Sequence, residues 1–367
     1  MYILPAAITF CVTVLAMLAL RPVAKGIDLV DKPGGRKTHD GHIPLIGGLA
    51  MFIGIAAGFG FFYQAIATDL PLIGVAAILV AMGLLDDRFG LASWVRLTVH
   101  FVVALALISG TGELVTQLGN PFGMGEVTLH GVWAMAFTVL LIGVAINAFN
   151  MLDGMDGLAG STAVIVIAAL AVVEHLTGGA SREIAICMVA AAAVCGFLVF
   201  NLPASYVGKM RCFMGDAGST MIGVVIAWLG IRTSQFAATG DVHPVTVLWI
   251  AGLPMFEFFW TIFRRLLRGH SPLNADREHF HHLLTDAGFS TGAALIVLVL
   301  ASTVFAGTGI ALSEVGAPDP QSLGLLMLAG AALVRLMYRA AWLVQFAPAG
   351  WRTAKHMPAE APHRLGA

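Results

Sequence analysis

The chain has 367 residues, of which 58% are hydrophobic and only 11% are charged. Soluble domains carry about 25% charged residues, so this composition excludes an ordinary soluble protein and indicates an integral membrane protein. The formal net charge of −1 says nothing useful about partners. We expect no nucleic-acid partner.

Apolar segments of roughly 17–25 residues, the length needed to cross a bilayer, follow one another along the chain. We count eleven, centred near residues 12, 53, 77, 103, 140, 167, 192, 226, 254, 303 and 331. No connection between them is long enough to form a core of its own, so we predict one all-α, polytopic transmembrane domain over residues 1–347. Residues 348–367 contain prolines and mixed charges and are expected to form a disordered tail.

The basic residues are distributed unevenly over the loops. When the loops are assigned alternately to the two sides of the membrane, 18 of the 20 basic residues fall on one side, and Arg182 and Arg232 fall on the other. Because basic residues accumulate in cytoplasmic loops, this pattern predicts an outer N-terminus and a cytoplasmic C-terminus. Residues 111–130 contain two acids and neither Lys nor Arg, and are expected to form an outer loop.

Five polar segments fall on the five predicted cytoplasmic loops. They are DKPGGRKTHDGHIPLIGG, LLDDRFG, NMLDGMDGLAG, VGKMRCFMGDAGS and SPLNADREHFHH. The aspartates expected at the ends of spans are Asp86, Asp87, Asp153, Asp156 and Asp216. Any one of them could simply cap a helix, but five on one predicted face favour a shared site. Unpaired charge at the membrane boundary is costly, so these acids need a counter-charge. Their oxygens suit Mg²⁺, with Mn²⁺ as an alternative ion.

A histidine cluster, His279, His281 and His282, lies on the last of these loops. Three imidazoles could bind zinc or iron, but the ordered motifs with Glu between the histidines are absent. Nearby arginines favour anion binding instead, since guanidinium and imidazolium both donate hydrogen bonds to phosphate. We therefore expect Arg264 and Arg265 to bind substrate. A loop that is basic only to stay in the cytoplasm would explain the arginines but not the histidines.

Four of these motifs together resemble those of one family. LLDDRFG, NAFNMLDGMDGLAG, FMGDAGS and REHFHH, in this order, are similar to the motifs of the polyprenyl-phosphate N-acetylhexosamine-1-phosphate transferases. SPLNADREHFHHLL and DLVDKPGGRKTHDGHIPLIGG look most like the undecaprenyl-phosphate N-acetylglucosamine-1-phosphate transferase branch, and the resemblance covers about residues 20–290. It implies transfer of a sugar-1-phosphate from a UDP-N-acetylhexosamine to undecaprenyl phosphate, with release of UMP. It also implies a Mg²⁺ requirement, a site facing the cytoplasm in the bacterial inner membrane, and a homodimer.

The resemblance also implies roles for the acidic motifs. Asp216 would be the metal ligand, and Asp86 and Asp87 would contact or deprotonate the lipid phosphate. Asn150 and Asp153 would support the metal and the phosphates.

The remaining motifs would bind the sugar nucleotide. Asp156 would accept a hydrogen bond from the uracil, and Phe213 would stack on it. The three histidines would hold the diphosphate, and Lys37 in the first loop would contact phosphate.

Other classes of protein also place acids in membranes. A secondary transporter, the main alternative, is expected to have acids near the middle of spans, and Glu257 in LPMFEFFW is the best candidate for such an acid. A CDP-alcohol phosphatidyltransferase would need Ala-Arg after the first acid of its motif, which DGMDGLAG lacks. Prenyl synthases use DDxxD, whereas DDRFG has Gly90 in the last position.

Overall fold

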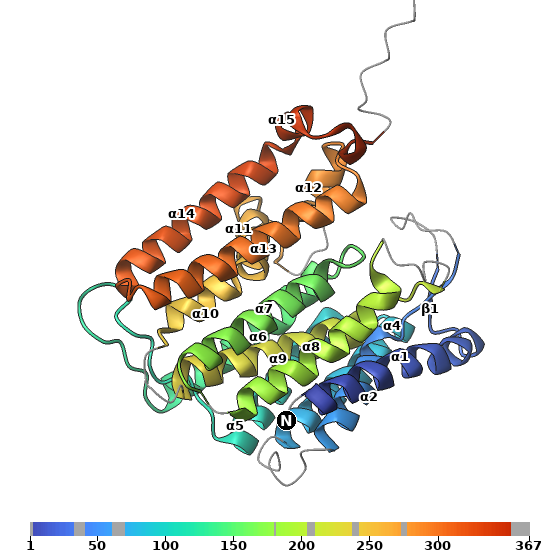
Figure 1. The fold of residues 1–367 in the computed structure, drawn as a ribbon, viewed down its shortest axis with the longest axis horizontal. Helices are drawn as coiled ribbons and strands as arrows, with labels where there is room; N and C mark the ends of the chain where they lie inside the picture. Colours follow the sequence, from blue (N-terminus) through green and yellow to red (C-terminus); the bar gives the residue numbers. More distant parts are fainter. Residues whose placement is uncertain are drawn as a thin grey trace, which may run out of the picture.

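The structure is a computed structural model that describes residues 3–32, 41–60, 70–179, 181–203, 210–236, 242–272 and 277–353. Helices make up almost all of it, and the long ones run roughly alongside one another (Figure 1). Among the described residues, nine helices are individually long and apolar enough to cross a membrane, and a bent pair of helices would make a tenth span. The prediction of an all-α polytopic membrane protein is confirmed. The count of eleven spans and the sides of the termini stay predictions.

The helices account for most of the described residues. In chain order the helices are α1 (Ile3–Gly26), α2 (Gly47–Gly60), α4 (Leu70–Phe89), α5 (Ser93–Thr111), α6 (Val132–Leu152), α7 (Leu158–Leu176), α8 (Ser181–Asn201), α9 (Gly215–Phe236), α10 (Pro244–Ile250), α11 (Gly252–Leu267), α12 (Phe280–Asp286), α13 (Thr291–Glu314), α14 (Asp319–Tyr338) and α15 (Ala340–Leu343). Two-residue strands β1 (Val30–Asp31) and β2 (Ile43–Pro44) pair in antiparallel fashion. Each of the eleven predicted segment centres lies within a helix.

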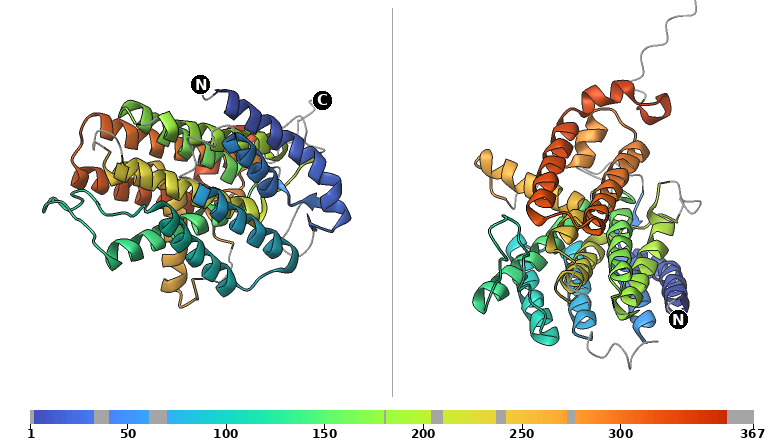
Figure 2. Two further views of the ribbon diagram at one scale, coloured as in Figure 1. Left: turned by 90° about the horizontal axis from the view of Figure 1, so that it is seen from below. Right: turned by 60° about the vertical axis from the view of Figure 1, so that its left-hand side comes forward.

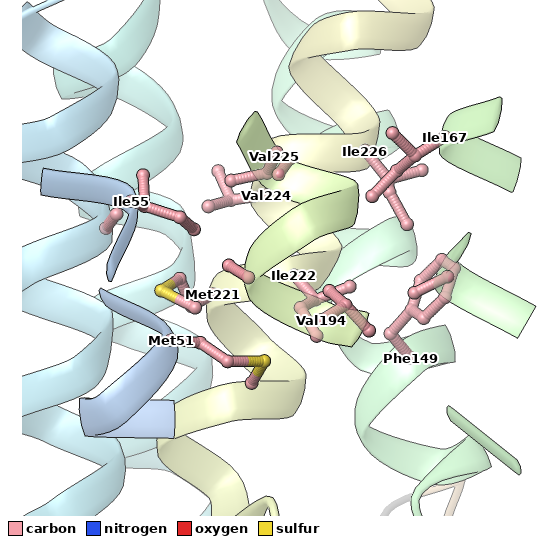
Figure 3. Packing of buried hydrophobic residues seen from close by; sticks show 14 of the residues in the cluster. Met51, Ile55, Phe149, Ile167, Val194, Met221, Ile222, Val224, Val225 and Ile226 are labelled. Atoms are coloured by element: carbon pink, nitrogen blue, oxygen red, sulfur yellow. The ribbon is translucent and has the colours of Figure 1, made fainter. Parts of the chain in front are cut away.

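Helix α9 forms the centre of the bundle. It contacts α2, α4, α6, α7, α8 and α10. In its most apolar stretch 89% of the residues are buried, against 22% in α1 at the edge. Met221 and Ile222 of α9 belong to one buried cluster with Met51 and Ile55 of α2 and Phe149 of α6 (Figure 3). A helix that is apolar on all sides is expected in this central position.

Glycines allow α2 and α4 to approach α9 closely at one end of the bundle. A Cβ atom on Gly83 of α4 would lie 2.2 Å from the backbone nitrogen of Ala217, and one on Gly48 of α2 would lie 2.2 Å from that of Gly218. Small residues of this kind favour close helix packing in lipid. The close approach brings the end of α4 against the beginning of α9, which is where two of the acidic motifs lie.

The C-terminal helices form a second group beside the central bundle. Helices α10 and α11 meet at an angle of 82°, and α11 projects away from the other helices (Figure 2). Helix α12 contacts α13, α14 and α15. Trp351 accepts a hydrogen bond from the backbone of Ser290, and Thr353 donates one to Gly288. The folded part therefore extends through residue 353, past the predicted boundary at 347, while residues 354–367 of the predicted tail lie outside the described residues.

Candidate active site

The first element of the site is the beginning of α9. Gly215 has φ +70°, a conformation that favours glycine, and the helix starts there with Asp216 in its first turn. The first N–H groups of a helix lack acceptors within the helix. The Asp216 N–H donates to Oδ1 of Asp87 on α4 at 3.1 Å, across 129 residues of sequence. The acids of LLDDRFG and FMGDAGS thus meet, as predicted, and we call this side of the bundle the acid end.

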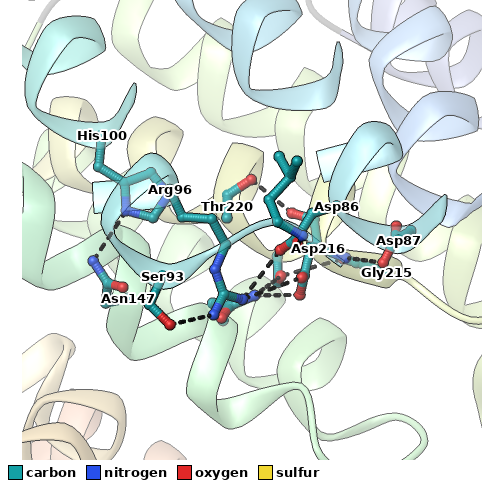
Figure 4. Close-up of polar contacts among 12 residues, drawn as sticks. Asp86, Asp87, Ser93, Arg96, His100, Asn147, Gly215, Asp216 and Thr220 are labelled. Atoms are coloured by element: carbon teal, nitrogen blue, oxygen red, sulfur yellow. Dashed lines mark hydrogen bonds and ion pairs between the residues drawn. The ribbon is translucent and has the colours of Figure 1, made fainter. Parts of the chain in front are cut away.

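Arg96 of α5 is the counter-charge that the sequence analysis missed. Its Nη1 donates to Oδ2 of Asp86 at 3.1 Å and lies 3.7 Å from Oδ2 of Asp216 (Figure 4). Oδ1 of Asp86 accepts from the backbone of Leu91 at 2.6 Å. Arg96 belongs to none of the motifs, and the only sequence signal for it was a basic residue one turn into the span after LLDDRFG.

Helix α6 contributes Asn150 and, just beyond its end at Leu152, Asp153. Asn150 Nδ2 donates to Oδ1 of Asp216 at 2.7 Å and to Oγ of Ser219 at 3.0 Å. Burial, and then the neighbouring Asp216, Asp87 and Asp156, raise the pKa of Asp153 well above its ordinary value. Acids from α4, from the end of α6 and from α9 therefore share one region, where burial and mutual repulsion disfavour the ionisation of Asp153.

This region fits a hard divalent cation. Oδ2 of Asp87 is buried without a hydrogen-bond partner among the described residues, and the Asp216 side chain is 32% exposed. Within the described ranges, no three His, Cys, Asp or Glu side chains form a complete metal site. Mg²⁺ typically takes only one or two carboxylates and fills its remaining positions with water and substrate phosphate. Asp216, supported by Asn150, is the side chain that would hold it.

Asp156 of the DGMDG segment is held by two polar partners. Its Oδ2 lies 2.7 Å from Nη2 of Arg211, and its Oδ1 accepts from Asn201 at 3.4 Å. The next residue, Gly157, has φ +79° and donates its N–H to Asn201. The structure therefore places Asp156 beside the segment that leads into Phe213, while its predicted contact with uracil stays a prediction.

The backbone around Phe213 is fixed by the first loop. Phe213 donates to the carbonyl of Pro44 at 2.9 Å and accepts from Gly47 at 3.0 Å. These bonds place FMGDAGS beside IPLIGG, so the first motif joins the same end of the molecule. Lys37, the predicted phosphate contact on that loop, lies outside the described residues.

The histidine cluster begins before α12 rather than inside it. His279 is the N-cap residue of α12, with extended backbone, and its Nδ1 lies 3.2 Å from Oε1 of the buried Glu257. Because His279 precedes the helix, all three rings gather, with centroids 4.1 Å apart for His281 and His282 and 5.9 Å apart for His279 and His281. Helical spacing alone had paired only His279 with His282.

His281 connects this cluster to the DGMDG segment. A Cβ atom on Gly154 would lie only 2.4 Å from Cε1 of His281, so glycine is needed for the contact. Burial, and then the neighbouring His282 and His279, lower the pKa of His281 to about 3. His281 is therefore a neutral imidazole, unlike the imidazolium that the anion-binding hypothesis assumed.

The two predicted substrate arginines lie in different surroundings. Arg264 is only 4% exposed, and its Nη1 donates to the carbonyl of Glu278 at 2.7 Å. Arg265 donates to the carbonyl of Pro272 at 2.6 Å and lines the large cavity described next. A role for Arg265 in binding substrate thus agrees with its position, whereas Arg264 holds the loop before α12.

A cavity of about 800 Å³ connects the acid end to the apolar interior. Its polar lining includes Asp86, Arg96, Asn150, Asp216, Arg265 and His279. From there it continues between α5 and α6, past Leu97, Phe101, Leu140 and Val144, as far as Val132 at the other end of α6. The site therefore combines a charged end with a long apolar corridor.

Comparison with known proteins agrees with this arrangement. The model of Glycosyl transferase family 4 matches residues 70–234. The chain is 37% identical over 302 residues to the undecaprenyl-phosphate alpha-N-acetylglucosaminyl 1-phosphate transferase of Escherichia coli (strain K12), covering 82% of this chain and 81% of that protein. Transferases with the same name are 36% identical in Yersinia pestis (80% of each chain) and 34% identical in Haemophilus influenzae (83% of this chain, 84% of that one). The chain belongs to glycosyl transferase family 4, which confirms the resemblance seen in the motifs.

The transporter alternative is not supported. Its main candidate, Glu257, is 1% exposed and accepts hydrogen bonds from the His279 ring and from the backbone of Phe280 at 3.3 Å. Glu257 thus positions the histidine cluster. The five predicted acids gather at one end of the helices rather than along the middle of spans.

Proposed function

We propose that this protein transfers N-acetylglucosamine-1-phosphate, or a related N-acetylhexosamine-1-phosphate, from its UDP derivative to undecaprenyl phosphate, giving the undecaprenyl-diphospho-sugar and UMP. The observation that carries the proposal is the single cavity that joins the acid end to the apolar corridor. A nucleotide sugar dissolves in water and a prenyl phosphate dissolves in the bilayer, so their catalyst must lie where the two meet. We place the acid end at the cytoplasmic face of the bacterial inner membrane, in agreement with the distribution of basic residues.

In the proposed reaction, an oxygen of the lipid phosphate attacks the β-phosphorus of the UDP-sugar. A new P–O bond forms there, and the bond to the bridging oxygen breaks, so that UMP leaves with the electron pair. Arg96 is placed to donate to an incoming phosphate at the boundary between the corridor and the acids. Asp86 is already bonded to Arg96 and Leu91, so Asp87, with its free Oδ2, is the carboxylate available to accept a proton from the lipid phosphate.

Two further features would offset the repulsion between the two anionic substrates. A bound Mg²⁺ would supply positive charge to the diphosphate and to the departing UMP. The gathered histidines, with Arg265, would donate hydrogen bonds to phosphate oxygens. Direct attack by the lipid phosphate is the simpler path, because a phosphate anion is already nucleophilic.

The proposed function is tested with purified protein, Mg²⁺, undecaprenyl phosphate and a panel of UDP-sugars. UMP should appear with at least one UDP-N-acetylhexosamine and only when the lipid phosphate is present; undecaprenol, which lacks the phosphate, is the control. The panel also identifies the sugar. Folded protein that releases no UMP with any sugar, or that instead moves labelled solute into liposomes, would overturn the proposal.

A further inference from the structure

A second polar pair lies inside the apolar part of the cavity, one helical turn from the acid end. His100 follows Arg96 by four residues on α5, and Asn147 precedes Asn150 by three residues on α6, so each lies on the same helix face as a residue of the site. Asn147 Nδ2 is 3.2 Å from Nδ1 of His100 (Figure 4), and both residues line the cavity. The proposed reaction gives this pair no role.

The contacts of Asn147 determine which nitrogen of His100 carries the hydrogen. Asn147 Nδ2 also donates to the carbonyl oxygen of Gly143 at 2.7 Å. A carbonyl oxygen can only accept, so the atom facing it must be the amide nitrogen rather than the amide oxygen. The same nitrogen faces Nδ1 of His100, which therefore accepts. A neutral imidazole in this arrangement carries its hydrogen on Nε2 and has a donor to offer there.

This donor has no acceptor within the part of the protein that the structure describes. His100 is only 4% exposed, and its Nε2 is buried without a hydrogen-bond partner. Buried donors are nearly always paired, so an unpaired one beside a cavity needs an explanation. Leu97 and Phe101, which flank His100 in the cavity wall, offer no acceptor. Because His100 lines the cavity, a molecule that enters the cavity can supply this acceptor.

We propose that His100 is a binding residue for the phosphate group of the prenyl phosphate, to which it donates a hydrogen bond from Nε2. This inference rests on the proposed function. Four residues of α-helix rise about 6 Å, a separation that one phosphate group hydrogen-bonded to both side chains can span between Arg96 and His100. Beyond His100 the corridor is lined by apolar side chains, so a prenyl chain would fill that part and leave its phosphate between Arg96 and His100. A UDP-sugar has no apolar chain that would favour its entry into this apolar corridor.

The first test separates the two substrates kinetically. His100→Leu removes the donor with little change in size, and His100→Gln replaces it with an amide that can donate. We expect His100→Leu to raise the KM for undecaprenyl phosphate by about tenfold or more, the effect of losing a hydrogen bond to a charged group, while the KM for the UDP-sugar stays unchanged. His100→Gln should recover most of the lost affinity. His175→Leu, the same change on an exposed part of α7, should behave like the wild type.

The second test measures binding without any turnover. Farnesyl phosphate and farnesol are titrated separately against the full-length protein, in the absence of UDP-sugar, by intrinsic tryptophan fluorescence. His100→Leu should weaken binding of farnesyl phosphate but not of farnesol. Equal effects on both ligands, an unchanged KM for the lipid, or failure of His100→Gln to recover affinity would overturn the proposal. If the wild type binds farnesyl phosphate but never releases UMP, the proposed function fails instead.

Discussion

The two ends of α9 each hold a cluster of acids, and the clusters differ in where the positive charge lies. At the end away from the active site, Arg232 lies between Glu113 and Glu183, donates hydrogen bonds to both, and lies over the ring of Trp228 at 5.1 Å. All three charged side chains are at most 17% exposed, and none lines the large cavity. At the acid end, Arg96 pairs with Asp86 and lies near Asp216, whose N–H donates to Asp87, and Asp153 lies near Asp216 and Asp87.

The comparison distinguishes a structural charge cluster from a functional one. At the far end, two buried glutamates share one arginine through direct hydrogen bonds, and removing one partner of such a cluster is strongly destabilising. Both ends have more carboxylates than arginines, but of the two only the acid end lines the cavity of about 800 Å³. Acids that repel one another beside a cavity favour the entry of a cation, so excess negative charge together with the cavity indicates ligand binding. The predictions below test this contrast.

The largest effect is expected for Asp216→Asn. Losing the carboxylate should lower kcat for UMP release by about 10²- to 10³-fold, because electrostatic stabilisation of the reacting phosphates depends on it, and should weaken the dependence on Mg²⁺. Thermal stability should stay the same or rise, since one repelling charge is removed. Glu183→Gln at the other end is the matched control and should lower stability while leaving kcat unchanged. Full turnover by Asp216→Asn would contradict the metal assignment.

The same substitution at the two arginines should have opposite consequences. Arg232→Leu leaves two buried glutamates without their partner, so we expect a loss of about 3–5 kcal/mol in stability and normal kcat in the molecules that remain folded. Arg96→Leu should instead reduce kcat by about 100-fold with a smaller change in stability, because it removes a donor to substrate phosphate. UMP release and thermal unfolding are measured on both variants, to distinguish the structural arginine from the functional one. Similar profiles for the two would refute the distinction.

Glu257 tests whether a buried acid that contacts the histidine cluster acts through its neighbours. Glu257→Gln keeps the shape but replaces a charged acceptor for His279 with a weaker neutral one. We expect kcat to fall by about tenfold, the difference between a charged and a neutral hydrogen bond, with KM for the lipid unchanged. An unchanged rate would assign Glu257 to stability alone, which thermal unfolding of the same variant would show.

The smallest effect concerns Asp153 and depends on pH. The raised pKa of Asp153 means that the folded protein resists an ionisation that the unfolded chain undergoes above about pH 4. Stability is therefore lost as pH rises from about 4 toward the raised pKa. Asp153→Asn removes this loss, so its Tm should exceed that of the wild type by about 2–4 °C at pH 8 and by less at pH 5. A larger gain at pH 5 would mean that the sign of the shift is wrong.

Much of the site could be predicted because its residues occur in motifs. Asp87 and Asp216 were expected together from one predicted face of the membrane, and the structure joins them through a hydrogen bond. Arg96 and the pairing of Glu257 with His279 could not be predicted in this way. Both the pairing of Arg96 with Asp86 and that of Glu257 with His279 depend on how separate segments pack, which does not follow from local sequence. In the sequence, an arginine at the start of a span looks like an ordinary positive-inside residue.

The sequence by itself determined that this is a helical membrane protein of one family. In lipid, long apolar segments must satisfy their backbone groups within helices, and four motifs in fixed order define the family. Only the tertiary structure decided which acids lack a partner, which arginine reaches the cavity, and that His100 presents its donor on Nε2. These properties depend on side chains from different helices meeting at distances of a few ångströms, and helix packing alone sets those distances.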